Sequence, residues 1–272
     1  MWQNRTVDLV IYAGPVIIKP AFRDIPWKRE TEIVPIVGSG STYFGTLAGD
    51  MRDSTGRMLP NLLRRYAGVD RQDIDKLALC AFSAGWGLLN RLFQNDDDRA
   101  EVDACVLSDA AFGTGLHGHA MYATDAMLGR HLMVATTTNN SANPSLGIMK
   151  TGRDTWLEIE SEAKLSASEE TTFRAFEPEQ VAPRNPMPPA SGGVWRTGKA
   201  CYWYDYTAPM AAPGTGNDFT HVEHHDLAVE AWTAYLIPYF AGAWLGVPWK
   251  VVAGVGAAAA GVVGAAAIWR YT

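Results

Sequence analysis

The sequence predicts an α/β protein with a mostly parallel β-sheet that helices cover on both faces. Short apolar runs recur along the chain, stretches with helical spacing separate them, and glycine or proline follows several of them. Strands that are buried on both faces of a parallel sheet appear as continuous apolar runs. The 272 residues, 47% of them hydrophobic, are enough for one large α/β domain.

The expected elements alternate along the chain. The run at 7–13 (VDLVIYA) is rich in β-branched residues and ends at Gly14-Pro15, which predicts a strand. Residues 59–67 (LPNLLRRYA) and 87–93 (GLLNRLF) have helical spacing. Five further apolar runs read as strands, at 32–37, 76–82, 102–107, 131–137 and 201–206.

The later part of the chain departs from this alternation. Residues 160–198 are rich in Pro, Ser and Gly, so we expect an insertion or cap with an exposed loop inside a domain covering 1–245. Thr220 followed by Glu223 fits a capping box and places a helix start near His221. That helix should continue through 226–243, with an interruption at Pro238.

Charge and cysteine content exclude several classes of protein. The 29 acidic residues outnumber the 23 basic ones, and no basic stripe is present, so we expect no nucleic-acid partner. Cys80, Cys105 and Cys201 each lie in an apolar run and are expected to be buried free thiols. We expect no cofactor, and synthesis in the cytoplasm without an N-terminal signal.

The stretch KLALCAFSAGWGLL at 76–89 is the most informative about function. An apolar strand leads into Ser83, small residues surround the serine, and a helix follows. This is the context of a nucleophile elbow, whose usual pattern G-x-S-x-G has Ala81 in place of the first glycine here. The strained turn projects the serine oxygen above the sheet edge, and the Ala84 amide can donate to an oxyanion there. An ordinary serine in a β–α turn is the alternative interpretation.

A serine nucleophile requires a base and a carboxylate that orients the base. Asp109 ends the strand after the one that carries Ser83, which favours it over Asp125 and Asp154. His221 follows the last strand and is the preferred base, with His224 as the alternative. The order Ser83, Asp109, His221 is then nucleophile, acid and base.

These residues together resemble the α/β-hydrolase superfamily, in particular its serine esterases and lipases, over about residues 7–240. The family usually places its acid one strand later, although some lipases place it where Asp109 stands. The resemblance implies an eight-stranded sheet and hydrolysis of an ester or amide through an acyl-enzyme. It also implies a second oxyanion donor after an early strand, at 13–15 or at 38–40, with Gly14 as first choice. Residues 136–156 (TTTNNSANPSLGIMKTGRDTW) further resemble phage and bacterial envelope-associated hydrolases.

Two other interpretations stay open. His117, His119 and the histidines at 221–225, together with Asp109, could form a metal site, although no zinc-protease signature occurs. Alternatively, His117 and His119 line a substrate cleft. The hydrolase fold could also be retained as a structural component of a virion or envelope assembly, with weak or no catalysis.

The C-terminal segment 246–272 is expected to form an apolar helix. Residues 251–268 (VVAGVGAAAAGVVGAAAI) have no polar side chain and would span about 27 Å as a helix, close to the thickness of a bilayer's hydrocarbon core. Trp249 and Trp269 flank this run as interfacial anchors would. We therefore expect a membrane anchor or an assembly helix, and substrates that are lipids or cell-envelope components.

Overall fold

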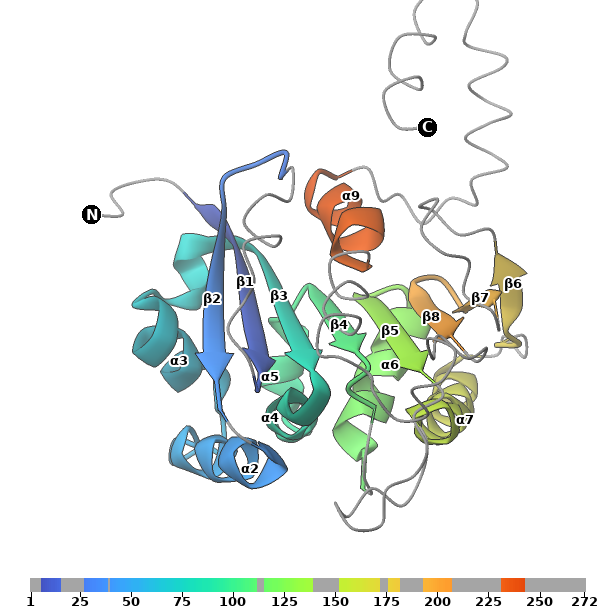
Figure 1. Ribbon diagram of the computed structural model, residues 1–272, viewed down its shortest axis with the longest axis horizontal. Helices are drawn as coiled ribbons and strands as arrows, with labels where there is room; N and C mark the ends of the chain where they lie inside the picture. Colours follow the sequence, from blue (N-terminus) through green and yellow to red (C-terminus); the bar gives the residue numbers. More distant parts are fainter. Residues whose placement is uncertain are drawn as a thin grey trace, which may run out of the picture.

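The computed structural model describes residues 6–15, 27–38, 40–111, 115–138, 152–171, 176–181, 193–206 and 231–242. Their centre is an eight-stranded sheet with the order β2-β1-β3-β4-β5-β8-β7-β6. Six neighbouring strands are parallel, and β7 and β6 pair antiparallel at one edge. This confirms the predicted α/β class with a mostly parallel sheet (Figure 1).

The strands agree closely with the apolar runs of the sequence. Their bounds are β1 Val7–Gly14, β2 Thr31–Val37, β3 Ile74–Phe82, β4 Ala104–Ser108, β5 Leu132–Thr138, β6 Glu179–Val181, β7 Gly193–Thr197 and β8 Cys201–Tyr206. All eight residues of β1 are buried, as expected for a strand inside a parallel sheet. The arrowheads of the six parallel strands point the same way in Figure 1, so their carboxyl ends share one edge.

One face of the sheet packs against most of the described helices. Side chains such as Leu9, Leu79 and Leu107 on this face share a core with Phe44, Leu88 and other helical residues. The helices that contribute to this core are α2 Gly40–Asp50, α3 Leu59–Leu62 with its π-helical continuation η1 Leu63–Ala67, α4 Trp86–Leu92, α6 His117–Leu128 and α7 Gly152–Glu170. The short η2 Arg71–Asp73 and α5 Asp96–Ala100 lead into β3 and β4.

The opposite face packs against one short described segment. Trp232, Tyr235 and Leu236 of η5 Trp232–Leu236 share a core with Tyr12 and Phe82. The segment continues as α9 Ile237–Phe240, which lies in front of the sheet in Figure 1. Helical segments therefore cover both faces, as expected. Cys80 lies on this face, Cys105 and Cys201 lie on the other, and burial raises the pKa of all three thiols.

The described parts of 160–198 differ from the insertion that the sequence suggested. Helix α7 extends to Glu170, and its buried residues Trp156, Ile159, Ala163 and Ala167 form one face. The strands β6 and β7 complete the sheet. The difference arises because the three- and four-residue spacing of a few apolar residues is hard to see among many charged ones.

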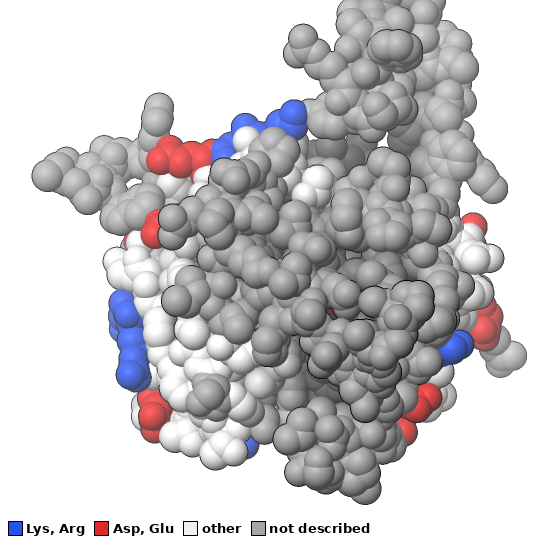
Figure 2. Space-filling model, in the orientation of Figure 1, with Lys and Arg blue, Asp and Glu red and all other residues white. Residues whose placement is uncertain are grey.

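The C-terminal segment 246–272 lies outside the described residues. Among the helices of the described part, none is both long and apolar enough to cross a membrane. On the face shown in Figure 2, the described charged side chains of both signs lie around the rim and form no broad basic patch.

Candidate functional site

The chain turns sharply at Ser83, where β3 ends. Ser83 begins the single 3-10 turn η3 (Ser83–Gly85), and α4 follows directly at Trp86. The φ angle of Ser83 is +48°, in the left-handed region that costs a residue with a side chain of the order of 1 kcal/mol or more. The structure therefore has the strand, strained serine and helix that the sequence predicted at this point.

Gly85 explains why a small residue is needed two positions after Ser83. A Cβ atom on Gly85 would lie 2.1 Å from the carbonyl oxygen of Ala13 and 2.6 Å from its carbonyl carbon, far inside van der Waals contact. Ala13 belongs to β1, which neighbours β3. Glycine thus allows the turn to pack directly on the backbone of the adjacent strand.

Asp109 has the same unusual backbone as Ser83. It follows β4, is fully buried, and has a φ angle of +43°. Its amide donates hydrogen bonds to the carbonyl oxygen of Thr136 at 2.9 Å and to the hydroxyl of Thr136 at 3.1 Å. Among the described residues, Ser83 and Asp109 are the only ones other than glycine with positive φ.

The register of the sheet places Ser83 and Asp109 side by side. Phe82 pairs with Ser108, so the residues that follow them leave two adjacent strands at the same level. Neighbouring strands lie about 5 Å apart, which sets the spacing of the two backbones. Ser83 also leaves the sheet where the strand order reverses between β1 and β3, and open α/β sheets bind ligands at such a crevice.

Asp205 is a residue at this edge that the sequence reasoning missed. Asp205 pairs with Thr137 of β5, and Asp109 lies beside Thr137 on the other side. Ser83, Asp109, Thr137 and Asp205 therefore form a row across four neighbouring strands, β3, β4, β5 and β8. Asp205 is 1% exposed, and its Oδ1 atom has no hydrogen-bond partner among the described residues. Burial raises its pKa to about 6, against the opposing influence of Arg153, whose Nε lies 3.6 Å from Oδ2. The sequence signal for Asp205 was a single acidic residue within the aromatic strand CYWYDY.

The two proposed oxyanion donors lie beside the turn. Ala84 is the residue directly after Ser83 and is half-buried within η3. Gly14 ends β1, and a Cβ atom there would lie 3.2 Å from the Cβ of Phe82. The alternative loop at 38–40 follows β2, which is one strand further from β3. Of the two loops, the structure therefore brings Gly14 closer to Ser83.

His117 and His119 have different surroundings, although both belong to the first turn of α6. His117 is exposed and pairs with Glu162. His119 is fully buried, and burial lowers its pKa to about 3 against a smaller opposing effect of the Trp86 backbone. Because its ring is not open to solvent, His119 does not line an open cleft.

The other acids and bases that the sequence suggested lie away from this row or outside the described residues. Asp125 is in α6, where its carboxylate binds Arg99 and Arg130 at 2.6 Å each, and Asp154 is in the first turn of α7. The histidines His221 and His224 lie outside the described residues. Within the described ranges, no group of three or more His, Cys, Asp or Glu side chains is arranged to hold a metal ion.

Fold and site together define an α/β protein with a strained serine and a buried aspartate at the carboxyl edge of its sheet. No protein-family model, no curated protein and no solved structure matches the chain.

Proposed function

We propose that the chain is a serine hydrolase of the α/β-hydrolase type, in which Ser83 is the nucleophile. The observation that carries the proposal is the strained backbone that Ser83 and Asp109 share at the ends of neighbouring strands. Strained conformations of this kind cluster at active sites. The eight-stranded, mostly parallel sheet and the contact between Gly85 and Ala13 also support it.

In the proposed reaction, the Ser83 oxygen attacks the carbonyl carbon of an ester or amide, and His221 takes the hydroxyl proton. The Ala84 amide, with a second donor at Gly14, stabilises the oxyanion of the tetrahedral intermediate. The imidazolium then protonates the leaving group, which departs to give the acyl-enzyme. Water, deprotonated by the same histidine, hydrolyses the acyl-enzyme. Asp109 orients the imidazole and stabilises its charged form.

The direct test is covalent labelling by a fluorophosphonate, followed by intact mass. We expect one adduct on the wild type and on Ser168→Ala, an exposed serine on α7, and none on Ser83→Ala. A well-folded wild type without an adduct would overturn the proposal and favour a non-catalytic component of a virion or envelope assembly. Inhibition by a chelator without any adduct would favour a metal-dependent hydrolase.

The same reagent assigns the base and the acid. We expect His221→Ala to abolish labelling and His224→Ala to retain it, and the reverse result would make His224 the base. Asp109→Asn should slow labelling strongly. Asp205→Asn, which changes a buried carboxylate two strands further along the same edge, is the matched control.

The substrate class and the location also remain proposals, and both rest on residues 251–268. Their length and apolar character support attachment to a membrane or a large assembly, which would bring the enzyme to lipid or cell-envelope substrates. Flotation of the full chain with phospholipid vesicles tests this. Flotation that is lost when charged residues replace Ala258 and Val262 would support insertion, and a protein that stays at the bottom would refute it.

A further inference from the structure

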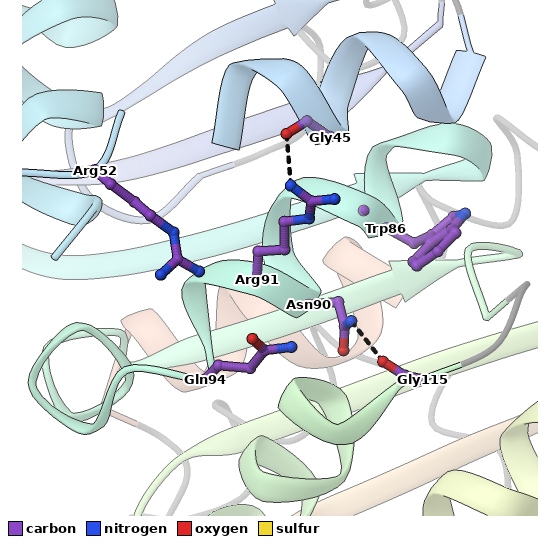
Figure 3. Close-up of a pocket in the computed structure, with 8 residues that line it drawn as sticks. Gly45, Arg52, Trp86, Asn90, Arg91, Gln94 and Gly115 are labelled. Atoms are coloured by element: carbon purple, nitrogen blue, oxygen red, sulfur yellow. Dashed lines mark hydrogen bonds between the residues drawn. The ribbon is translucent and has the colours of Figure 1, made fainter. Parts of the chain in front are cut away.

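A polar pocket lies beside the helix that follows Ser83. Its volume is about 440 Å³, within the range of small-molecule sites. Figure 3 shows that Arg91, Asn90 and Gln94 enter it from α4 and its end, Arg52 from the end of α2, and Gly115 from the opposite side. Trp86 lies at the other end of the pocket from Arg52 and Gln94 (Figure 3).

The charge of this pocket is unbalanced. Arg52 and Arg91 line it, and no carboxylate is among the described residues that do so. Eight other described arginines have a carboxylate within 4 Å, whereas neither Arg52 nor Arg91 has one in the described part of the chain. The protein as a whole carries a net charge of −6, so two uncompensated guanidinium groups at one pocket are a local exception.

The polar wall of the pocket is held in place by hydrogen bonds to the backbone. One Arg91 nitrogen donates to the carbonyl oxygen of Gly45 at 2.8 Å, which orients the guanidinium, and its other donors have no partner in the described part of the chain. The Asn90 side chain donates to the carbonyl oxygen of Gly115 at 3.0 Å and accepts from the His119 amide at 3.2 Å. A wall fixed in this way loses little freedom when a ligand binds.

We propose that this pocket binds the anionic group, a phosphate or a carboxylate, of a small molecule. Guanidinium groups match the oxygen geometry of both anions, and the Gln94 amide can supply a further donor. Arg91 belongs to α4 and Arg52 to the chain just after α2, so the two guanidinium groups reach the pocket from different elements. The site does not depend on the proposed hydrolase activity. Trp86, three residues after Ser83, lines one end of the pocket and offers an aromatic surface there.

The test is isothermal titration calorimetry of the full chain with sodium phosphate and, separately, with sodium succinate, at low ionic strength. Ser83→Ala serves as the background, so that the result is independent of any catalysis. We expect saturable binding of at least one of the two anions. Arg52→Gln should weaken it about tenfold or more, since a charge-assisted contact is lost, and Arg91→Gln should do the same. Arg65→Gln, an exposed arginine on η1, removes the same charge elsewhere and should leave binding unchanged.

Three results would overturn the proposal. Neither anion binding, or binding that Arg52→Gln leaves unchanged, would show that the pocket is not the site. Equal loss in Arg65→Gln would show that only the overall charge matters. Arg52 has no side-chain partner among the described residues, so its variant should fold normally even if Arg91→Gln does not. Competition by vesicles containing phosphatidylglycerol, but not by phosphatidylcholine vesicles, would identify a lipid headgroup as the source of the anion.

Discussion

Replacing Gly85 by alanine should damage both the stability of the protein and the geometry at Ser83. The new Cβ atom would lie 2.1 Å from the Ala13 carbonyl oxygen, whereas real Cβ contacts are essentially never shorter than 3.0 Å. The turn and β1 must therefore separate by about 0.9 Å or more. The Ala13 carbonyl is a backbone group of β1, and the new Cβ atom is fixed to the backbone of η3, so no side-chain rotation can relieve the contact.

Overpacking of a core costs about 1–3 kcal/mol, and we expect the upper end here because backbone must move. For a protein of this size, a loss of about 3 kcal/mol lowers Tm by roughly 6–12 °C. Urea unfolding followed by circular dichroism measures the change in free energy. Fluorophosphonate labelling of the variant, at a temperature where it is folded, should also be slower than that of the wild type, because Ser83 has moved.

Gly49 is the matched control. It lies in α2, and a Cβ atom there would meet nothing within 4 Å. Gly49→Ala should therefore stabilise the protein by up to about 1 kcal/mol through helix propensity alone. If Gly85→Ala proves as stable as the wild type, then the turn does not approach β1 as closely as described.

Three other predictions concern buried or strained groups. Ser83→Gly should be about 1 kcal/mol more stable to urea than Ser83→Ala, because glycine adopts positive φ without strain, and equal stabilities would contradict that strain. Asp205 has a pKa of about 6 when folded, above its ordinary value of 3.8, so its ionisation destabilises the fold as pH rises through this window. The free energy of unfolding of Asp205→Asn should then exceed that of the wild type by about 3 kcal/mol at pH 8 and match it near pH 4, and a difference independent of pH would refute this cause. Asp98 is fully buried and accepts hydrogen bonds from Arg57 and from two backbone amides. Asp98→Ala should therefore lower the free energy of unfolding by about 3 kcal/mol or more, as measured by thermal unfolding. Asp97 is exposed, and Asp97→Ala should change it by no more than about 0.5 kcal/mol.

The sequence was most informative where burial on both sides of the sheet produced continuous apolar runs. That signal located β1 and β3 within one or two residues, and with β3 it located the turn at Ser83. It failed for α7, where charged residues obscure a narrow buried face. It also missed Asp205, because strand pairing over long sequence distances, and hence the row along the carboxyl edge, cannot be read from local patterns.

The position of β3 and β4 inside the sheet has a consequence for how the protein unfolds. Strand β3 lies between β1 and β4, and strand β4 lies between β3 and β5. Nearly all residues of both strands are buried. Amide hydrogens on such strands exchange with solvent only when the whole domain opens. The arrangement of Ser83 and Asp109 should therefore persist through local opening of β6, β7 or the surface helices, and should disappear in the same cooperative transition as the fold itself.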